Sequence, residues 1–318
     1  MLEISRAAVI GAGQMGHGIA QVLAYAVPHV AMYDVSKEIL ENAHSRISQS
    51  LQLLQRNGLK LPVSEADILD RIKITCDLSE AVSDAQFVIE AAPEELELKQ
   101  QLFADLERET PNDAVLATNS SGLSLAKVGV LLKPEARTRL VGSHFFIPAQ
   151  IVPLVEVSRS AMTKAGIFDR TVHLWARCGK KPIRVQVDLP GYVANRLQTA
   201  LTREAIHLLA NGVATAADVD EAVRSGFGLR YLVSGPLEQR DITGLDLHLK
   251  VMKELWPELN QDTDPHTFIT EKVACGELGV RGGRGFHDWT DGDFDEITAS
   301  RTEALVNAMA RLGVDFFP

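Results

Sequence analysis

The sequence predicts two domains, an α/β domain with a mainly parallel sheet and an all-α domain after it. Three observations support this fold class. A glycine-rich turn near the N-terminus follows an apolar strand pattern, short apolar runs then alternate with helical patterns, and beyond residue 188 the strand patterns stop. Such alternation is typical of a parallel sheet covered by helices on both faces. We therefore expect an α/β domain over residues 1–188 and a helical domain over residues 189–318.

The glycine-rich turn has the spacing Gly-x-Gly-x-x-Gly and directly follows the apolar segment 7–10. Gly11 allows the tight turn, Gly13 lets backbone N–H groups approach a pyrophosphate, and Gly16 lets the helix pack closely on the strand. The phosphates would lie at the positive end of the helix dipole. This unit predicts a Rossmann-type, dinucleotide-binding domain whose turn supplies the binding residues Gly11, Gly13, Gln14, Met15 and Gly16.

An acidic residue ends the second strand of this unit. The apolar segment 29–33 leads into Asp34, twenty-three residues after Gly11. A carboxylate at this point accepts hydrogen bonds from the adenosine ribose hydroxyls and repels a 2′-phosphate. We therefore predict that the cofactor is NAD rather than NADP.

Periodicity gives the remaining elements of the first domain. A helical pattern over residues 36–54 has Ser36 as its N-cap and ends at Asn57-Gly58. Further helices are predicted at residues 95–109, 124–132 and around 163–178. Short apolar runs predict strands at residues 72–75, 87–92, 114–118, 140–146, 154–157 and 183–187.

The pattern changes at Asp188-Leu189-Pro190-Gly191. Beyond it, Thr215-x-x-Asp218 resembles a capping box, which marks a helix start. The predicted helices of the second domain span residues 192–210, 216–224, 236–256 and 266–275.

Composition limits the possible partners. The 318 residues carry a formal net charge of −10 and no concentrated basic stretch, which argues against a nucleic-acid or anionic-membrane partner. Cys76, Cys178 and Cys275 have neither metal-ligand spacing nor a disulfide framework, so we expect no metal and a reducing compartment. No apolar run approaches the roughly 20 residues of a membrane span, and residues 1–6 are too short and polar for a secretory signal. We expect a cytoplasmic protein.

Polar residues lie in or directly after three of the apolar strands, where packing alone would not place them. Ser121 comes after the strand 114–118, at the carboxyl edge of the sheet, where open α/β folds bind ligands. His144 lies in the strand 140–146, and Glu156, twelve residues later, is flanked by apolar neighbours. A buried carboxylate needs a partner, and His144 is the natural candidate. Taken singly, Ser121 could form a turn, His144 could be a core histidine and Glu156 an edge-strand charge.

A histidine oriented by a carboxylate is a standard general base, because the acid fixes the tautomer and stabilises the imidazolium. A fourth segment, Gly191-Tyr192-Val193-Ala194-Asn195-Arg196-Leu197, opens the helical domain. Asn195 could cap the helix there, or its amide could bind a substrate oxygen.

These residues, in this order, resemble the L-3-hydroxyacyl-CoA dehydrogenase superfamily over nearly the whole chain. The resemblance implies that Ser121 and Asn195 bind substrate and that Glu156 supports His144 in proton abstraction. It also implies cofactor contacts near the nicotinamide from Glu94 and Lys99 and places Ser121 and Arg281 in the cofactor set. Arg281 replaces a lysine of the family in the Gly279 to Gly285 loop and keeps the charge but not the geometry.

The segment Gly226-Phe227-Gly228-Leu229-Arg230-Tyr231, followed by Gly235-Pro236-Leu237-Glu238, is similar to the lambda-crystallin branch, which includes L-gulonate 3-dehydrogenase. Carnitine 3-dehydrogenases have a comparable arginine–aromatic pair, whereas acyl-CoA members usually have no arginine there. Arg230 could clamp a free carboxylate bidentately, which a thioester would not require. It could also form a surface salt bridge.

Two departures from the family pattern bear on the substrate. Ile147 replaces the amide of the family's His-x-x-Asn-Pro segment, so the positioning by that amide must be absent or supplied elsewhere. Ser50 matches a position that touches CoA in acyl-CoA members, but Asn57 stands where a phosphate-binding lysine is expected. The second departure weakens the expectation of a CoA substrate.

We therefore expect NAD-dependent oxidation of the C3 hydroxyl of a small 3-hydroxy carboxylic acid to the 3-keto acid, and the reverse. The substrate would be a small anion, and the resemblance implies a homodimer formed through the helical domain. One alternative is a short-chain L-3-hydroxyacyl-CoA (3-hydroxybutyryl-CoA) dehydrogenase that uses the same catalytic residues. Another is a noncatalytic NAD(H)-binding protein.

Overall fold

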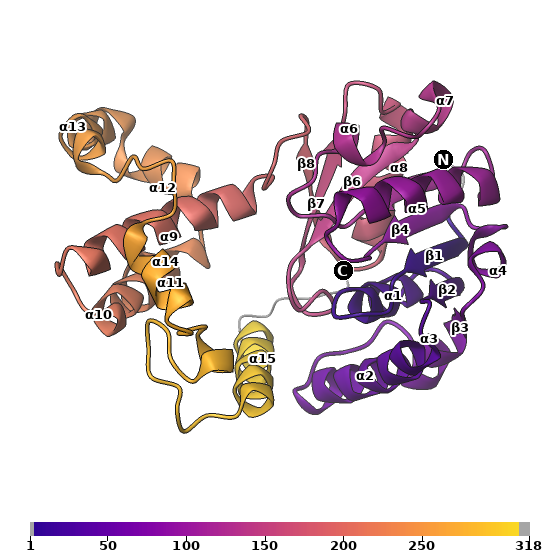
Figure 1. Ribbon diagram of the computed structural model, residues 1–318, viewed down its shortest axis with the longest axis horizontal. Helices are drawn as coiled ribbons and strands as arrows, with labels where there is room; N and C mark the ends of the chain where they lie inside the picture. Colours follow the sequence, from indigo (N-terminus) through magenta and orange to yellow (C-terminus); the bar gives the residue numbers. More distant parts are fainter. Residues whose placement is uncertain (1–2, 312–318) are drawn as a thin grey trace. The chain divides into compact units, whose positions relative to one another are not determined.

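The computed structural model describes residues 3–311 and contains one eight-stranded sheet with the order β3-β2-β1-β4-β5-β6-β7-β8 (Figure 1). All neighbouring strands are parallel except β6 and β7, which are antiparallel. The predicted Rossmann-type, mainly parallel sheet is therefore confirmed. The strands are β1 Arg6–Ile10, β2 His29–Tyr33, β3 Ile72–Thr75, β4 Phe87–Glu90, β5 Val115–Thr118, β6 Leu140–Phe145, β7 Leu154–Arg159 and β8 Lys181–Val185.

The central strands are apolar throughout because both faces of the sheet are covered. Every residue of β4, β5 and β6 is buried. Along β1, Val9 points into the core cluster that contains α1, α2 and α8, whereas Ala8 and Ile10 point into the cluster that contains α4, α5 and α6. The two clusters are the two helix-covered faces of the sheet.

Eight α-helices accompany these strands in the described part of the chain. The predicted helix after Asp34 is present as α2, and the Ser36 hydroxyl accepts a hydrogen bond from the Ile39 N–H at its start. The short helices α3, α4 and α7 were not predicted. The bounds are α1 Gly16–Ala24, α2 Lys37–Arg56, α3 Glu65–Arg71, α4 Leu78–Val82, α5 Leu96–Glu109, α6 Leu125–Val128, α7 Pro134–Arg137 and α8 Ala165–Arg177.

From residue 194 to residue 311 the regular elements are helices, as predicted. Two predictions of detail were wrong. The expected single helix over 236–256 is divided at Gly244, whose φ of 93° lies in the left-handed region that favours glycine. The helix expected from residue 192 begins at Ala194. The elements are α9 Ala194–Ala210, α10 Ala216–Glu221, the π-helix η1 Ala222–Phe227, α11 Gly228–Tyr231, α12 Pro236–Thr243, α13 Leu245–Leu255, the 3₁₀ turn η2 Trp256–Glu258, α14 Thr267–Ala274, the 3₁₀ turn η3 Val280–Gly282 and α15 Phe294–Arg311.

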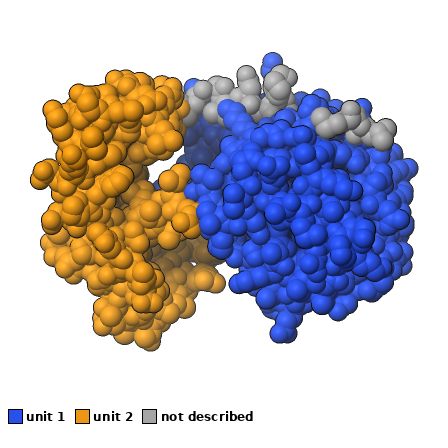
Figure 2. All heavy atoms as spheres, turned by 90° about the horizontal axis from the view of Figure 1, so that it is seen from above, with its two compact units in different colours: residues 1–193, 301–318 blue, residues 194–300 orange. Residues whose placement is uncertain are grey.

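The chain forms two compact units, Met1–Val193 together with Arg301–Pro318, and Ala194–Ser300 (Figure 2). The last part of the unpredicted helix α15 belongs to the first unit, since Val306 and Met309 are buried against Leu54 and Ile151. The predicted domains, 1–188 and 189–318, have different limits and stay a prediction. We call the two units the sheet unit and the helical unit.

Candidate active site

The glycine-rich turn has the shape that a dinucleotide pyrophosphate needs. Gly11 has a φ of 102°, and a Cβ atom on Gly16 would lie 1.7 Å from the Gly11 carbonyl oxygen, so helix α1 touches the turn. A Cβ atom on Gly13, by contrast, would meet nothing within 4 Å. Gly11 and Gly16 thus allow the fold, whereas Gly13 leaves open space at the N-terminus of α1, where a phosphate is favoured.

Asp34 is tied to the same turn. Its Oδ2 accepts a hydrogen bond of 2.9 Å from the Ala12 N–H, and its Oδ1 accepts one of 3.1 Å from the Ser36 N–H. The carboxylate is therefore held at the end of β2, next to the turn, where the ribose of a dinucleotide is expected.

A cavity of about 840 Å³ joins these features. It is large enough for a cofactor and lies entirely within the sheet unit. The predicted cofactor residues that line it are Gly11, Gly13, Gln14, Met15, Asp34, Glu94, Lys99 and Ser121. Open space at Gly13, a carboxylate at Asp34 and a single cavity containing both fit NAD.

Lys99 is held by carboxylates inside the sheet unit. Only 1% of its side chain is exposed, and its Nζ lies 2.5 Å from Glu90 Oε1 and 3.2 Å from Glu94 Oε2. Glu90 is fully buried and also accepts hydrogen bonds from the Thr118 hydroxyl and the Ala92 N–H. Burial raises the pKa of Glu90, while the charge and hydrogen bond of Lys99 act against this shift.

Glu94 connects this ion pair to the Ser121 turn. Its Oε1 accepts hydrogen bonds from the Ser120 hydroxyl, the Ser121 N–H at 3.1 Å and the Gly122 N–H at 2.9 Å. Partial burial tends to raise the pKa of Glu94, but these hydrogen bonds and Lys99 outweigh it and lower the pKa. An ionised Glu94 therefore fixes the turn that presents Ser121.

Ser121, His144 and Glu156 form one line of hydrogen bonds. Ser121 Oγ lies 3.0 Å from His144 Nε2, and His144 Nδ1 lies 2.9 Å from Glu156 Oε2. The antiparallel pairing of β6 with β7 places His144 directly opposite Glu156 in register. Both residues are buried, with exposed side-chain fractions of 3% and 0%. The structure thus brings together the three residues that the sequence suggested as a serine contact, a base and its support.

Tyr192 and Val193, in the segment that follows β8, contact His144 and Glu156. The Val193 N–H donates a hydrogen bond of 2.9 Å to Glu156 Oε1. The Tyr192 ring lies 5.2 Å from the His144 ring, measured between centroids, and the Phe146 ring lies 4.8 Å from it in an edge-to-face arrangement. The imidazole is therefore in contact with a carboxylate at Nδ1 and with two aromatic rings.

Three predicted site residues belong to the helical unit rather than the sheet unit. Asn195, near the start of α9, lines a cavity of about 640 Å³ with Arg203 and His266. Arg230 lies in α11 and is exposed. Arg281 lies in η3 and is also exposed. Their roles stay predictions.

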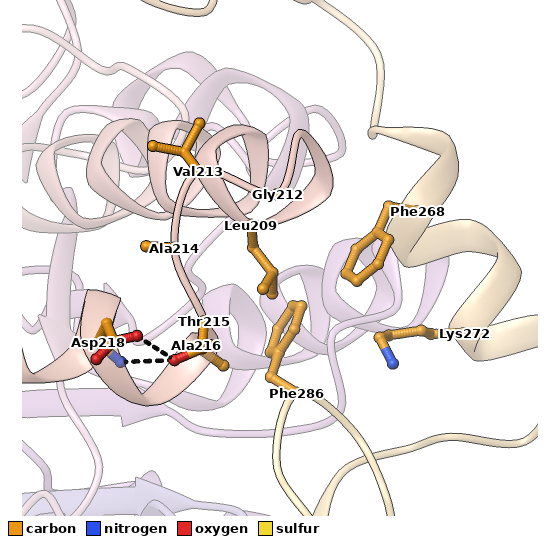
Figure 3. Close-up of a pocket in the computed structure, with 10 residues that line it drawn as sticks. All are labelled: Leu209, Gly212, Val213, Ala214, Thr215, Ala216, Asp218, Phe268, Lys272 and Phe286. Carbon is orange, nitrogen blue, oxygen red and sulfur yellow. Dashed lines mark hydrogen bonds between the residues drawn. The ribbon is translucent and has the colours of Figure 1, made fainter.

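A second cavity of the helical unit, of about 560 Å³, contains none of the predicted residues (Figure 3). The stacked rings of Phe268 and Phe286 face each other at 6.5 Å between centroids, with Leu209 beside them and Lys272 at the rim. Lys272 is paired with Glu277. Asp218, the other charged residue of the lining, accepts a hydrogen bond from the Thr215 hydroxyl, so both charged groups at this cavity are already satisfied within the unit.

Sequence reasoning missed Glu90 and Tyr192. A glutamate at the end of the otherwise apolar strand β4 could have signalled Glu90, because a buried carboxylate requires a partner such as Lys99. Tyr192 gave no such signal, because its position depends on a left-handed backbone with a φ of 48°. Among residues 3–311, no helix is long and apolar enough to cross a membrane.

Comparison with known proteins identifies the family of the chain. Residues 6–189 match the family described as "3-hydroxyacyl-CoA dehydrogenase, NAD binding domain", and residues 191–289 match its C-terminal domain. The chain is 32% identical over 304 residues to 5-formyl-3-hydroxy-2-methylpyridine 4-carboxylate 5-dehydrogenase of Mesorhizobium japonicum, covering 95% of this chain and 96% of that protein. It is 34% identical over 292 residues to a probable 3-hydroxybutyryl-CoA dehydrogenase of Bacillus subtilis, covering 91% and 99%.

Solved structures show the same relationship. The crystal structure of a 5-formyl-3-hydroxy-2-methylpyridine 4-carboxylic acid 5-dehydrogenase, described as NAD⁺-dependent, has a TM-score of 0.90, 30% identity, and coverage of 98% of this chain and 99% of that one. That of (S)-3-hydroxybutyryl-CoA dehydrogenase from Ralstonia eutropha has a TM-score of 0.73, 30% identity, and coverage of 90% and 99%. The predicted NAD cofactor and dehydrogenase class are confirmed. The chain belongs to the 3-hydroxyacyl-CoA dehydrogenase family of NAD-dependent oxidoreductases.

Proposed function

We propose that this enzyme oxidises the C3 hydroxyl of a small 3-hydroxy carboxylic acid to the 3-keto acid, and catalyses the reverse reaction. The hydrogen-bonded line Ser121, His144 and Glu156 carries the proposal, because it supplies an oriented base at the carboxyl edge of an NAD-binding sheet.

The chemistry of the site follows from this line. With its Nδ1–H donated to Glu156, His144 presents an unprotonated Nε2 toward Ser121. The Ser121 hydroxyl orients the substrate hydroxyl, and His144 Nε2 removes the hydroxyl proton. Glu156 then stabilises the imidazolium. Bound NAD, held at Gly13 and Asp34, would supply the acceptor for the hydride of C3. We assign Asn195 to a second contact with the reacting oxygen and Arg230 to the substrate carboxylate.

Contacts within helix α2 favour a free acid over a CoA thioester. Ser50, which matches a CoA-contacting position, is 7% exposed and its Oγ has no hydrogen-bond partner among the described residues. Asn57 donates its side-chain amide to the Leu53 carbonyl and ends the helix instead of offering a positive charge. Neither side chain is arranged to bind a CoA phosphate.

Two relatives named for free carboxylates support the same substrate class. One is the pyridine carboxylate dehydrogenase of Mesorhizobium japonicum, and the other is an L-carnitine dehydrogenase of Streptomyces griseus, 37% identical over 237 residues. We place the chain in the lambda-crystallin branch on the segment around Arg230. The alternative, a 3-hydroxybutyryl-CoA dehydrogenase, is favoured by relatives from Bacillus subtilis and Mycobacterium tuberculosis that carry this name.

Replacing Arg230 by alanine separates the two substrates. We expect kcat/KM for free 3-hydroxy acids such as L-gulonate, carnitine and 3-hydroxybutyrate to fall about 10- to 100-fold, because a charged hydrogen bond to the carboxylate is lost. Turnover of acetoacetyl-CoA is expected to change little. Arg224→Ala is the matched control, since Arg224 is another exposed arginine of the helical unit, is paired with Glu221 and is not assigned to the substrate. A preference for acetoacetyl-CoA in the parent enzyme, unaffected by Arg230→Ala, would favour the CoA alternative.

We infer that the helical unit pairs with a second copy of this chain. Of residues 194–300, only Ser234 and Asn260 are buried. Large apolar side chains stay exposed, among them Val233 at 89%, Leu237 at 81% and Trp256 at 61%. Helices normally bury an apolar stripe against another element, so this unit lacks most of the core that its length requires. A second copy would supply it.

Sedimentation equilibrium at micromolar concentration tests the pairing. We expect a species of twice the 34.7 kDa chain mass. Leu237→Asp should shift the population toward monomer, whereas the same change at the exposed Val35 of the sheet unit should not. A monomer with a cooperatively folded helical unit would contradict the inference. A cytoplasmic location stays a prediction.

A further inference from the structure

The turn at residues 191–193 touches every member of the Ser121, His144 and Glu156 line. The Gly191 N–H donates to the Ser121 carbonyl at 3.3 Å, and the Val193 N–H donates to Glu156 Oε1 at 2.9 Å. Between them, the Tyr192 ring packs on the His144 ring at 5.2 Å with an interplanar angle of 31°. One short piece of chain therefore contacts the serine backbone, the imidazole and the carboxylate together.

Tyr192 occupies an unfavourable backbone conformation to make these contacts. Its φ of 48° is the only positive φ of a non-glycine residue in the part of the chain that the structure describes. Side chains with a Cβ atom rarely adopt this region, and bulky ones do so at functional sites, where the surroundings fix them. A glycine would adopt this backbone without strain, so the requirement at position 192 is for the side chain.

The Tyr192 side chain is enclosed by a matching site. It is 2% exposed, and its hydroxyl lies with the hydroxyl of Ser158 beside Gly142. A Cβ atom on Gly142 would come within 2.1 Å of Ser158 Oγ and 3.0 Å of the Tyr192 hydroxyl. Burial raises the pKa of Tyr192 to about 12, with Ser158 acting in the opposite direction, so the phenol stays neutral. Gly142 and Ser158 thus make room for a neutral tyrosine on strands β6 and β7, which carry His144 and Glu156.

Hydrogen bonds leave one degree of freedom of the histidine weakly determined. The hydrogen bonds with Ser121 and Glu156 fix the positions of the two ring nitrogens. They constrain rotation of the ring plane about the line through these nitrogens less strongly. Aromatic packing on the ring face supplies this constraint, since such pairs have a preferred separation and orientation. We propose that Tyr192 is a positioning residue that holds the imidazole of His144 between Ser121 and Glu156.

The proposal rests on the proposed function, in which His144 is the base. It predicts that the aromatic ring of Tyr192 matters and that its hydroxyl matters little. It also predicts that replacing Tyr192 by glycine lowers kcat, although glycine relieves the backbone strain at this position. These expectations distinguish positioning of His144 from a general contribution to folding.

Two substitutions separate the ring from the backbone. Tyr192→Gly keeps the left-handed turn and removes the ring, and we expect kcat for the oxidation to fall about 10- to 100-fold while KM for NAD changes less than about twofold. Tyr192→Phe keeps the ring and is expected to retain kcat within about threefold. If Tyr192→Gly does not fold, Tyr192→Asn serves in its place, because asparagine tolerates this backbone region.

The decisive readout is the ¹⁵N NMR spectrum of the His144 side chain at a pH where the ring is neutral. The parent enzyme and Tyr192→Phe should give sharp Nδ1 and Nε2 signals at the same chemical shifts, whereas Tyr192→Gly should give shifted or broadened signals, because the ring is no longer held in one orientation. An unchanged ¹⁵N spectrum and kcat in Tyr192→Gly would overturn the proposal. Because the spectrum needs no substrate, it tests positioning independently of turnover. A failure of the proposed function would instead appear as retained activity in His144→Ala.

Discussion

Replacing His144 by alanine is expected to lower kcat for the oxidation about 1000-fold, within the range that a general base contributes. The reason is that His144 Nε2, 3.0 Å from Ser121 Oγ and oriented by Glu156, is the group placed to take the substrate proton. NAD affinity should stay within about twofold, because His144 is not among the residues that line the cofactor cavity. Steady-state kinetics and fluorescence titration with NADH measure the two quantities.

His29→Ala is the matched control for this substitution. His29 begins β2 and is exposed, away from the Ser121, His144 and Glu156 line. Its replacement should leave kcat unchanged. Turnover of His144→Ala comparable to that of His29→Ala would refute the assignment of the base.

Replacing Lys99 by methionine is expected to lower the free energy of unfolding by about 3–5 kcal/mol, the usual cost of removing one partner of a buried ion pair. Met has a similar volume, so the effect comes from the charge. Without Lys99, the fully buried Glu90 would lose its countercharge at 2.5 Å, and Glu94 would lose one at 3.2 Å. Urea denaturation followed by circular dichroism gives the change.

Two controls identify the cause. Lys37→Met removes a lysine from the exposed pair with Glu41 and should cost less than about 0.5 kcal/mol. Adding Glu90→Gln to Lys99→Met should recover much of the lost stability, since a neutral amide can still bind Thr118 and costs less to bury than a carboxylate. Equal losses in Lys99→Met and Lys37→Met would show that the buried pair is not a determinant of stability.

Local sequence features were sufficient for the nucleotide unit. The spacing of Gly11, Gly13 and Gly16 and the acid at Asp34 predict a turn whose geometry the structure contains, because each residue acts within about 30 residues of chain. The partnership of His144 with Glu156 was also predictable, since a carboxylate in an apolar strand needs a buried partner.

The antiparallel pairing of β6 with β7 was harder to predict, although it places that partnership in register. The loop between the two strands is too short for a parallel crossover, so adjacent strands here must be antiparallel. Whether β7 lies next to β6 is a property of the sheet topology, which local residue patterns do not give. Residue patterns also gave no indication of helix α15, whose only buried residues are Val306 and Met309. Its packing on Leu54 and Ile151 depends on distant parts of the chain.

The helical unit was predicted less completely than the sheet unit. Its helices were largely expected from their periodicity, but the break at Gly244 was not, although a glycine inside a helical pattern is a signal of an interruption. Many apolar side chains of these helices stay exposed, among them Val233, Leu237 and Trp256. The roles of Asn195, Arg230 and Arg281 depend on surroundings that their own sequence segments do not encode.

Isotope transfer locates the carbon that the enzyme oxidises. The enzyme would be given a 3-hydroxy acid carrying deuterium at C3, with NAD, and the products would be analysed by mass spectrometry. We expect the deuterium in the reduced nucleotide and the 3-keto acid as the other product. Deuterium retained at C3, or oxidation at another carbon, would show that the hydride does not come from C3.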